Sequence, residues 1–319
     1  MADPINLFRD AIRMALGNAP EVIEPGRLHR FPTNERRGDV AGWCKLFADL
    51  RGGVFGCMRQ RISEAWTATD RRSMTVAERL TLVRQIKAAT REREQQRRAE
   101  WAVNAKHVTS LWAQCMPVSD NDPVHRYLCR RLAIDTFNAP PCLRLHPALD
   151  YWHEGKRLGA YPAMVATLAA PNGQIVALHR TWLTPEGRKA DVPGKEKKLT
   201  CTSGALTGAS IRLQKPASGV IGIAEGIETA LAASQASGVP TVAGYCGGAL
   251  AGYQWPAGVQ RLVVFADHDP AGREAADKLK VRALRAGLRI NVLAPTEAGA
   301  DWCDVWAQRD AVAVHGSGQ

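Results

Sequence analysis

The last third of the chain alternates short apolar runs with patterns typical of helices. Four apolar runs predict buried strands: VIGIA at 220–224, VPTVAGY at 239–245, RLVVFA at 261–266 and LRINVLAP at 288–295. Two helical patterns follow the first and third of these runs, IETALAASQASG and DPAGREAADKLKVRALRAG, and each ends at a glycine. Strands that alternate with helices predict a parallel sheet with right-handed crossovers.

The N-terminal pattern is typical of a small β-rich domain. The apolar residues Ile5, Phe8, Ile12 and Leu16 recur at helical spacing, which predicts a short amphipathic helix. Residues 29–59 then alternate apolar and polar positions between glycine-rich turns, and this pattern predicts a small antiparallel sheet.

A long helix and a hairpin are expected in the middle of the chain. Residues 73–115 contain no Gly or Pro and are rich in helix formers. Ser73 or Thr75 provides a cap, with Glu78 three residues after Thr75. Further on, residues 161–183 form two apolar runs around a Pro-Asn-Gly turn, which predicts a β-hairpin.

The positive charge is concentrated in the first two thirds of the chain. The 319 residues carry a net charge of +11. Residues 1–215 hold 34 Lys/Arg and 21 Asp/Glu, a net charge of +13, whereas residues 216–319 hold 8 and 10, a net charge of −2. A basic front part suits a polyanion such as nucleic acid. The segment 71–100, with nine basic and four acidic residues, fits either a helix that faces nucleic acid or a solvated connecting helix.

Cysteine use and hydropathy favour a cytoplasmic protein. The eight cysteines are scattered singly with no CxxC, so free thiols in a reducing compartment are expected. No apolar run reaches the roughly 18 residues of a membrane helix. The first residues also lack the uninterrupted apolar segment of a secretory signal. We therefore expect a cytoplasmic protein without a membrane partner.

Carboxylates follow three of the predicted strands at the point where each strand ends. Glu225 follows the first strand, Asp267 and Asp269 follow the third, and Asp301 and Asp304 come shortly after the fourth. The carboxyl ends of parallel strands meet at one edge of the sheet, where ligands bind. Five carboxylates at that edge would repel each other unless cations lie among them, and such oxygen ligands suit Mg²⁺ or Mn²⁺. Phosphoryl transfer is the expected chemistry.

Two of these acids, and the nearby Glu228, also have a purely structural interpretation. Asp269, followed by Pro270, is a good helix N-cap. Glu228 fits a first-turn acid that favours the helix dipole, and Asp304 fits an exposed helix residue. The more specific signal is the combination of Glu225 at one strand end with an Asp-x-Asp at a later one.

Two motifs resemble those of the topoisomerase–primase (Toprim) domain. They are IAEGIETALAA, with Glu-Gly after a strand, and VVFADHDPAGREAA, with Asp-x-Asp before a helix. A third segment, GADWCDVW, resembles a downstream acidic motif of many members, and the resemblance covers residues 216–310. Bacterial primases carry an acid four residues after the Glu. This chain has Thr229 there and Glu228 one residue earlier, so the role of Glu228 stays open.

The segment before these motifs resembles the primases of phages and plasmids. Residues 161–183 are similar to a primase stretch in which two strands lead to an arginine, here Arg180. Bacterial primases continue with Lys-Tyr-Leu-Asn. This chain has Lys197, Lys198 and Leu199, without the Tyr and the Asn.

The N-terminal region resembles a primase zinc-binding domain that has lost its metal ligands. Within residues 29–59, Cys44 and Cys57 have no paired Cys or His neighbours. A structural zinc site needs four ligands, so zinc is not expected here.

The resemblance implies a DNA primase, which makes short RNA primers on single-stranded DNA. Catalysis and binding of Mg²⁺ or Mn²⁺ would then fall to Glu225, Asp267 and Asp269, with Asp301 and Asp304 as further metal ligands. The nucleotide or the template would be bound by Arg180, Lys197 and Lys198. Implied partners are a single-stranded DNA template, ribonucleoside triphosphates and a separate helicase, since the chain has no GxxxxGK[ST] motif. A Toprim-type nuclease and a non-catalytic DNA-binding replication adaptor remain as alternatives.

The expected fold class is α/β, with a Toprim parallel sheet flanked by helices. A mixed α+β basic primase subdomain and a small β-rich N-terminal domain precede it. Five parts are expected along the chain. They are a zinc-ribbon-like domain without zinc ligands (1–66), a basic helical connector (67–115), a basic primase-core subdomain (116–215), the Toprim catalytic domain (216–310) and a tail (311–319).

Overall fold

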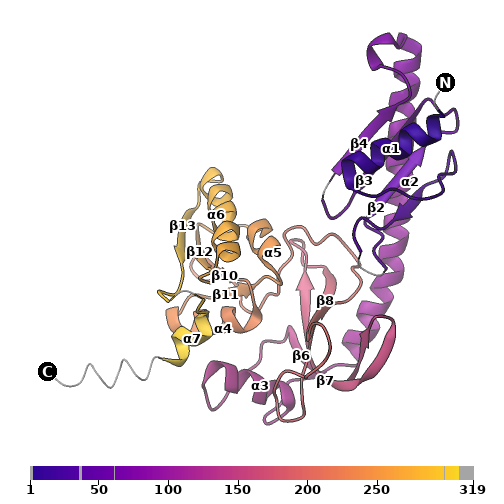
Figure 1. Ribbon diagram of the computed structural model, residues 1–319. Coiled ribbons are helices and arrows are strands. Elements are labelled where there is room, and N and C mark those ends of the chain that lie inside the picture. Colours follow the sequence, from indigo (N-terminus) through magenta and orange to yellow (C-terminus); the bar gives the residue numbers. More distant parts are fainter. Residues whose placement is uncertain (1–2, 36–37, 61, 298, 309–319) are drawn as a thin grey trace. The chain divides into compact units, whose positions relative to one another are not determined.

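The computed structural model describes residues 3–35, 38–60, 62–297 and 299–308 (Figure 1). Its α-helices are α1 (Pro4–Leu16), α2 (Val76–Ala113), α3 (Pro123–Leu132), α4 (Ile227–Ser237), α5 (Gly247–Gly252), α6 (Pro270–Arg285) and α7 (Trp302–Ala307), with a short 3₁₀ helix at Arg71–Ser73. Its strands are β1 (His29–Phe31), β2 (Gly42–Leu46), β3 (Gly52–Cys57), β4 (Ile62–Thr67), β5 (Met116–Pro117), β6 (Leu143–His153), β7 (Lys156–Ala169), β8 (Ile175–Trp182), β9 (Lys197–Leu199), β10 (Val220–Ala224), β11 (Thr241–Ala243), β12 (Arg261–Phe265) and β13 (Arg289–Leu293). The tail expected at 311–319 lies outside the described residues.

The chain divides into two compact units, Met1–Ala99 and Glu100–Gln319. The sequence predicts several boundaries, whereas the contacts divide the chain once, after Ala99. The reason lies in the first half of α2, which buries Leu82 and Ala89 in one apolar cluster with Trp43 and Val54. This half of α2 therefore packs within the N-terminal unit, and α2 continues into the second unit after Ala99.

The long helix predicted from residues 73–115 is α2. Thr75 and Glu78 form the predicted cap, because the Glu78 amide donates to Thr75 Oγ1 at 3.3 Å and the Thr75 amide donates to Glu78 Oε2 at 2.9 Å. Neither α2 nor any other described helix combines the length and the apolar character that crossing a membrane requires.

The N-terminal unit contains an antiparallel sheet with the order β1-β2-β3-β4, which confirms the small sheet predicted from residues 29–59. The predicted amphipathic helix is α1. Its residues Phe8, Ile12 and Leu16 are buried in a cluster with Cys44, whose thiol is thereby part of the apolar core.

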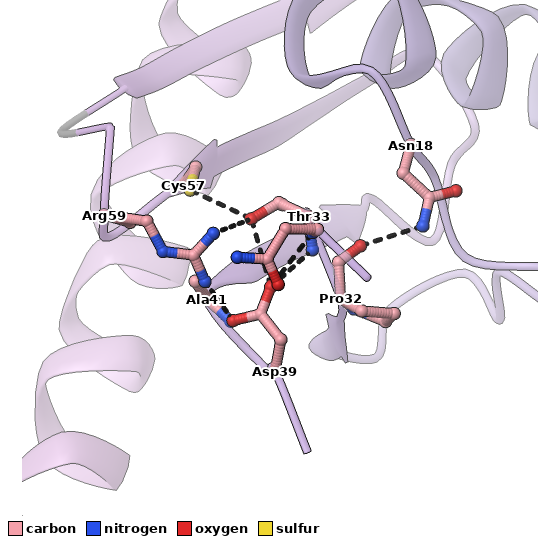
Figure 2. A network of polar contacts seen from close by, with 8 residues as sticks. Asn18, Pro32, Thr33, Asp39, Ala41, Cys57 and Arg59 are labelled. Carbon is pink, nitrogen blue, oxygen red and sulfur yellow. Dashed lines mark hydrogen bonds and ion pairs between the residues drawn. The ribbon is translucent and has the colours of Figure 1, made fainter. Parts of the chain in front are cut away.

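A polar network closes the loops at one end of this sheet (Figure 2). At its centre, Asp39 Oδ2 accepts from the amides of Thr33 at 2.7 Å and Asn34 at 3.2 Å, and Asp39 Oδ1 accepts from the Ala41 amide at 3.3 Å. Arg59 pairs with the same carboxylate, whose side chain is 8% exposed. This carboxylate therefore ties Thr33, Asn34 and Ala41 to Arg59, which follows β3. The thiol of Cys57, the last residue of β3, lies 3.5 Å from Thr33 Oγ1.

We expect Asp39→Ala to destabilise the N-terminal unit by about 3 kcal/mol, because three part-buried amides and Arg59 lose their acceptor at once. Hydrogen exchange of the β2 and β3 amides in the full chain measures this loss of stability, and should become about 100-fold faster at neutral pH.

Burial opposes ionisation, but the amides of Thr33 and Ala41 together with Arg59 hold the pKa of Asp39 below its usual value. The stabilisation is therefore present at neutral pH and is lost as the pH falls through that lowered pKa. Asp10→Ala, at an exposed surface pair, is the matched control, and equal exchange in both variants would contradict the assignment.

The second unit contains an antiparallel sheet of order β5-β6-β7-β8-β9. The hairpin predicted from residues 161–183 is formed by β7 and β8, with Met164 opposite Thr181 in the register. In β9, Lys198 is paired with Arg180 and Lys197 with Thr181. Side chains that are directly opposite in an antiparallel pair share a face, so Lys197 and Lys198 lie on different faces of this sheet.

The four strands predicted in the last third form a parallel sheet with the order β11-β10-β12-β13. Alternate residues of its strands face opposite sides. Ile221 and Ile223 pack in a cluster with residues of α5 and α6, whereas Ala224 and Phe265 pack in another cluster with α4. Helices thus cover both faces of the sheet, which confirms the predicted α/β architecture (Figure 1).

One apolar core joins the antiparallel and parallel sheets of this unit. Leu143 and Met164 of the first sheet are buried in the same cluster as Ala230 of α4 and Phe265 of β12. The chain between the sheets adds a backbone bridge, in which the Ile211 amide donates to the Ala243 carbonyl at 2.7 Å. Cutting the chain near residue 215 would therefore divide a packed core.

Candidate active site

Two carboxylates lie at the ends of adjacent strands of the parallel sheet. Glu225 follows β10 directly, and Asp267 comes two residues after β12. The two strands are paired in parallel with Ala224 opposite Phe265, so both acids lie at the same edge of the sheet. The sequence predicts this edge as the site, and the topology places Glu225 and Asp267 there.

A cavity of about 220 Å³ opens beside these two acids. Its charged lining falls into two groups: the carboxylates of Glu225, Glu228, Asp267 and Asp301, and the cationic side chains of Arg131, Lys189 and Lys197. Tyr127, Gly226 and Thr229 complete the lining. Carboxylates and cations that converge on one small polar cavity favour a ligand that carries both phosphate groups and a metal ion.

The carboxylates at this edge repel each other. Burial, and then the charges of Glu225, Asp301 and Asp269, raise the pKa of Asp267 to about 6. Burial and Asp269 also raise the pKa of Glu225, although the Gly247 amide donates to that carboxylate and opposes the shift. Both carboxylates are therefore less stable as anions than they would be in water.

Asp269 caps α6, as its structural interpretation predicts. Its Oδ1 accepts from the Gly272 amide at 2.6 Å. A Cβ atom at Gly272 would lie 2.8 Å from the Asp267 carbonyl oxygen, so only glycine allows the first turn of α6 to approach the Asp267 loop this closely. The cap holds Asp269 next to the site, where its charge raises the pKa of both neighbouring acids.

The acids of the third motif have different surroundings. Asp301 lines the cavity, caps α7 and pairs with Arg131 at 3.2 Å. Asp304 turns back instead and accepts from the Asp301 amide at 2.9 Å in a capping box, and it is exposed. Of these two predicted metal ligands, the structure thus brings only Asp301 to the cavity lining.

The carboxylate edge fits a hard divalent cation. Within residues 3–308, as far as they are described, no three His, Cys, Asp or Glu side chains are already gathered as a closed metal site. Asp267 Oδ1, however, is buried without any hydrogen-bond partner among the described residues. A buried carboxylate oxygen without a donor, among acids whose pKa is raised by burial and then by mutual repulsion, is an environment that a cation stabilises. The donor set consists of carboxylate oxygens, which suits Mg²⁺ or Mn²⁺.

The structure separates the three predicted nucleotide-binding cations. Lys197 lines the cavity and pairs with Glu228. Arg180 is largely buried and donates to the Leu199 carbonyl at 2.7 Å. Lys198 donates to the Trp152 carbonyl at 2.7 Å and lies 3.8 Å from the centre of the Tyr151 ring. Strand alternation in β9 explains why only Lys197 reaches the cavity.

Two cationic residues at the cavity were missed by the sequence analysis. Arg131 is in the last turn of α3, and Lys189 lies in the loop between β8 and β9, where it pairs with Glu196 at 2.8 Å. The run of basic residues in VHRYLCRRL was a signal, but spacing alone does not distinguish Arg130 from Arg131. Arg130 instead donates to the Gly187 carbonyl at 2.8 Å.

Two family models match the chain. Residues 220–311 match a model described as the Toprim domain, and residues 102–213 match one described as a domain of unknown function, DUF7146. The comparison with curated proteins finds no match. The Toprim match confirms the resemblance predicted from the Glu-Gly and Asp-x-Asp motifs.

The chain is also similar to solved structures of primases. A DNA primase domain from Pseudomonas aeruginosa is 18% identical, with a TM-score of 0.35 over 54% of this chain and 56% of that one. The primase fragment of the bacteriophage T7 primase-helicase protein is 18% identical, with a TM-score of 0.36 over 58% and 68%. The RNA polymerase domain of Mycobacterium tuberculosis primase is 16% identical, with a TM-score of 0.38 over 68% and 81%. The chain thus spans about half the length of the Pseudomonas domain.

Proposed function

We propose that this chain, whose residues 220–311 are a Toprim domain, is a DNA primase that makes short RNA primers on single-stranded DNA. One observation carries the proposal: a single cavity is lined both by the carboxylate edge and by three cationic side chains. Nucleotidyl transfer from a triphosphate needs both kinds of group, because the reaction is mainly a matter of positioning and charge stabilisation.

In this proposal Glu225, Asp267 and Asp269 hold Mg²⁺ or Mn²⁺. When bound, the metal stabilises the negative charge of the triphosphate and of the attacking 3′-hydroxyl oxygen. The carboxylate of Asp267 is the central ligand, because its buried Oδ1 has no donor from the described protein. Asp301 takes a supporting role, since Arg131 already shares its charge.

The cationic side chains of the cavity lining are assigned to the triphosphate. Arg131, Lys189 and Lys197 bring three positive charges to the cavity, which balances much of the charge of a metal-bound nucleotide. Arg131 offers a planar group that can bind two phosphate oxygens at once, and the lysines act as point charges. In this assignment Arg180 and Lys198 support the sheet and stay outside the nucleotide site.

The proposed partners follow from the same chemistry. The template is single-stranded DNA, and the substrates are ribonucleoside triphosphates. The sequence of residues 1–319 contains no phosphate-binding GxxxxGK[ST] loop, so strand opening is assigned to a helicase outside these residues, in the setting of a phage or plasmid replication system.

One assay on a single preparation tests the proposal. The full chain is incubated with Mg²⁺ or Mn²⁺, labelled ribonucleoside triphosphates and single-stranded DNA of mixed sequence, and both new products and DNA cleavage are measured. We expect short RNA products that depend on metal and on template. Metal-dependent cleavage without incorporation would replace the primase with a nuclease that uses the same acids. DNA binding with neither activity would favour the non-catalytic adaptor.

A further inference from the structure

A buried carboxylate outside the proposed metal ligands lies in the wall of the same cavity. Glu228, in the first turn of α4, is 4% exposed. Its Oε1 accepts from the Tyr127 hydroxyl at 2.5 Å, and Lys197 Nζ lies 2.9 Å from Oε1 and 3.0 Å from Oε2. The three residues come from α3, β9 and α4, so the contact joins three segments that are far apart in the sequence.

The surroundings of Glu228 keep it charged. Burial alone would raise its pKa, but Lys197 and the hydroxyl of Tyr127 lower the pKa to about 2. His179, which is also buried near this group, is kept neutral at pH 7 because burial lowers its pKa to about 4. The positive partner of the Glu228 carboxylate is therefore Lys197.

Fold stability alone does not require this arrangement. A buried ion pair contributes little net stability, because the cost of removing both charges from water offsets their attraction, and apolar residues of similar size do as well. The sequence also allows a structural interpretation, in which Glu228 interacts favourably with the helix dipole. An exposed acid without a contact to Tyr127 would provide that interaction equally well. What the network does achieve is to fix the position of one ammonium group.

That ammonium group is the accessible member of the pair in the cavity lining. The side chain of Lys197 is 33% exposed, whereas that of Glu228 is 6% exposed, so the lysine is the member of the pair that a ligand can reach. Both carboxylate oxygens of Glu228 are engaged by Tyr127 and Lys197. A free lysine has a flexible four-carbon stem, and this contact removes much of that freedom before any ligand arrives.

We propose that Glu228, braced by Tyr127, is a positioning residue that holds Lys197 against the phosphates of the incoming ribonucleoside triphosphate. The inference rests on the proposed function and names the part of the substrate that this wall of the cavity contacts. Glu228 itself touches no substrate. It acts through Lys197, which lines the same cavity as the carboxylates of Glu225 and Asp267.

The test distinguishes positioning of Lys197 by Glu228 from a contact that only stabilises the fold. Equilibrium binding of Mg²⁺·ATP is measured for the full chain with Glu228→Gln, with Lys197→Met, with Tyr127→Phe and with the double variant Glu228→Gln/Lys197→Met, and each melting temperature is recorded. The matched control is Glu274→Gln, which breaks an exposed ion pair with Lys278 on α6.

We expect Glu228→Gln to weaken nucleotide binding about 10- to 100-fold, because a cation displaced by about 1 Å loses most of its effect. Tyr127→Phe should give a smaller loss in the same direction, and Glu274→Gln none. In the double variant no uncompensated charge is left, so its melting temperature should return close to the wild-type value while nucleotide binding stays weak. In steady-state assays the loss should appear mainly as a raised KM for nucleotide, with DNA affinity unchanged.

Other outcomes overturn the inference. Glu228 would have only a structural role if Glu228→Gln kept the wild-type affinity for nucleotide. The same conclusion would follow if, in the double variant, nucleotide affinity recovered together with the melting temperature. Failure of the proposed function is a separate result, namely a wild-type protein that incorporates no nucleotide. If the wild-type protein binds no Mg²⁺·ATP at all, both the function and the positioning role are rejected.

Discussion

Asp267→Asn is expected to abolish primer synthesis, with a loss of about 10³-fold or more. The substitution keeps the shape of the side chain and removes the charge that the metal needs. Asp267 Oδ1 is buried and no described residue donates to it, so this oxygen is available to a cation rather than used by the fold. The measurement is incorporation of labelled ribonucleotides on single-stranded DNA in Mg²⁺ or Mn²⁺. Asp269→Asn should behave alike, because asparagine still caps α6 through the Gly272 amide.

Asp267→Asn should also be more stable than the wild type when no metal is present. The pKa of Asp267 is raised to about 6 in the folded chain, so its ionisation costs stability that grows as the pH rises from about 4 to above 6. A shift of about two pKa units corresponds to at most about 3 kcal/mol. We expect Asp267→Asn to melt several degrees higher at pH 8 and at the same temperature as the wild type near pH 4. Mg²⁺ should then raise the melting temperature of the wild type but not that of Asp267→Asn.

The control for both measurements is Asp277→Asn, which removes the same charge from the exposed face of α6. It should leave synthesis, melting temperature and the response to Mg²⁺ unchanged. Full synthesis by Asp267→Asn would reject the carboxylate edge as the catalytic site. A melting temperature that falls equally at both pH values would reject the raised pKa of Asp267, and with it the effect of burial and repulsion at this edge.

The second large effect concerns DNA binding and salt. The N-terminal unit holds 19 Lys/Arg and 12 Asp/Glu, a net charge of +7. On α2 the exposed residues Arg84, Lys87 and Arg91 follow one another at helical spacing on one face. If this face contacts DNA, the affinity of the full chain for single-stranded DNA should fall on the order of 100-fold between 50 and 200 mM salt, for about six neutralised phosphates. The full chain is used because the core of the second unit would be divided near residue 215.

Reversing these three charges to Glu should weaken binding by about 30-fold or more at low salt. The slope of log Kd against log salt should also fall by about 2, since each lost phosphate contact on single strands removes about 0.7. Fluorescence anisotropy with a labelled oligonucleotide measures both quantities. The control reverses Lys280, Arg285 and Arg289, which changes the net charge by the same amount on exposed positions of α6 and β13. An equal loss in both variants would assign the effect to overall charge, and no loss in the α2 variant would identify this face as solvated.

The sequence by itself determined the parallel sheet and the acids at its edge. The reason is that both are local properties. Each strand is a short apolar run and each helix has its own start and stop signals. An acid that directly follows such a run must lie at the carboxyl end of the strand. Glu225, Asp267 and the cap at Asp269 could thus be predicted without knowledge of any distant contact.

Strand register decided which lysine reaches the cavity. Lys197 and Lys198 are neighbours of the same type in the sequence, and their motif match does not separate them. Their faces depend on the pairing of β9 with β8, which sets Lys198 opposite Arg180 and Lys197 opposite Thr181. A shift of one residue would exchange them, because side chains alternate along a strand.

Tertiary packing alone decided the roles of Glu228 and Arg131. Tyr127 and Glu228 are 101 positions apart, and Arg131 and Asp301 are 170 apart. No local pattern encodes such pairs, because they depend on how α3 packs in the core shared by the two sheets. As a first-turn helix acid, Glu228 is indistinguishable in sequence from one that faces solvent. Burial removed water as its partner, and the ammonium of Lys197 and the hydroxyl of Tyr127 replaced it.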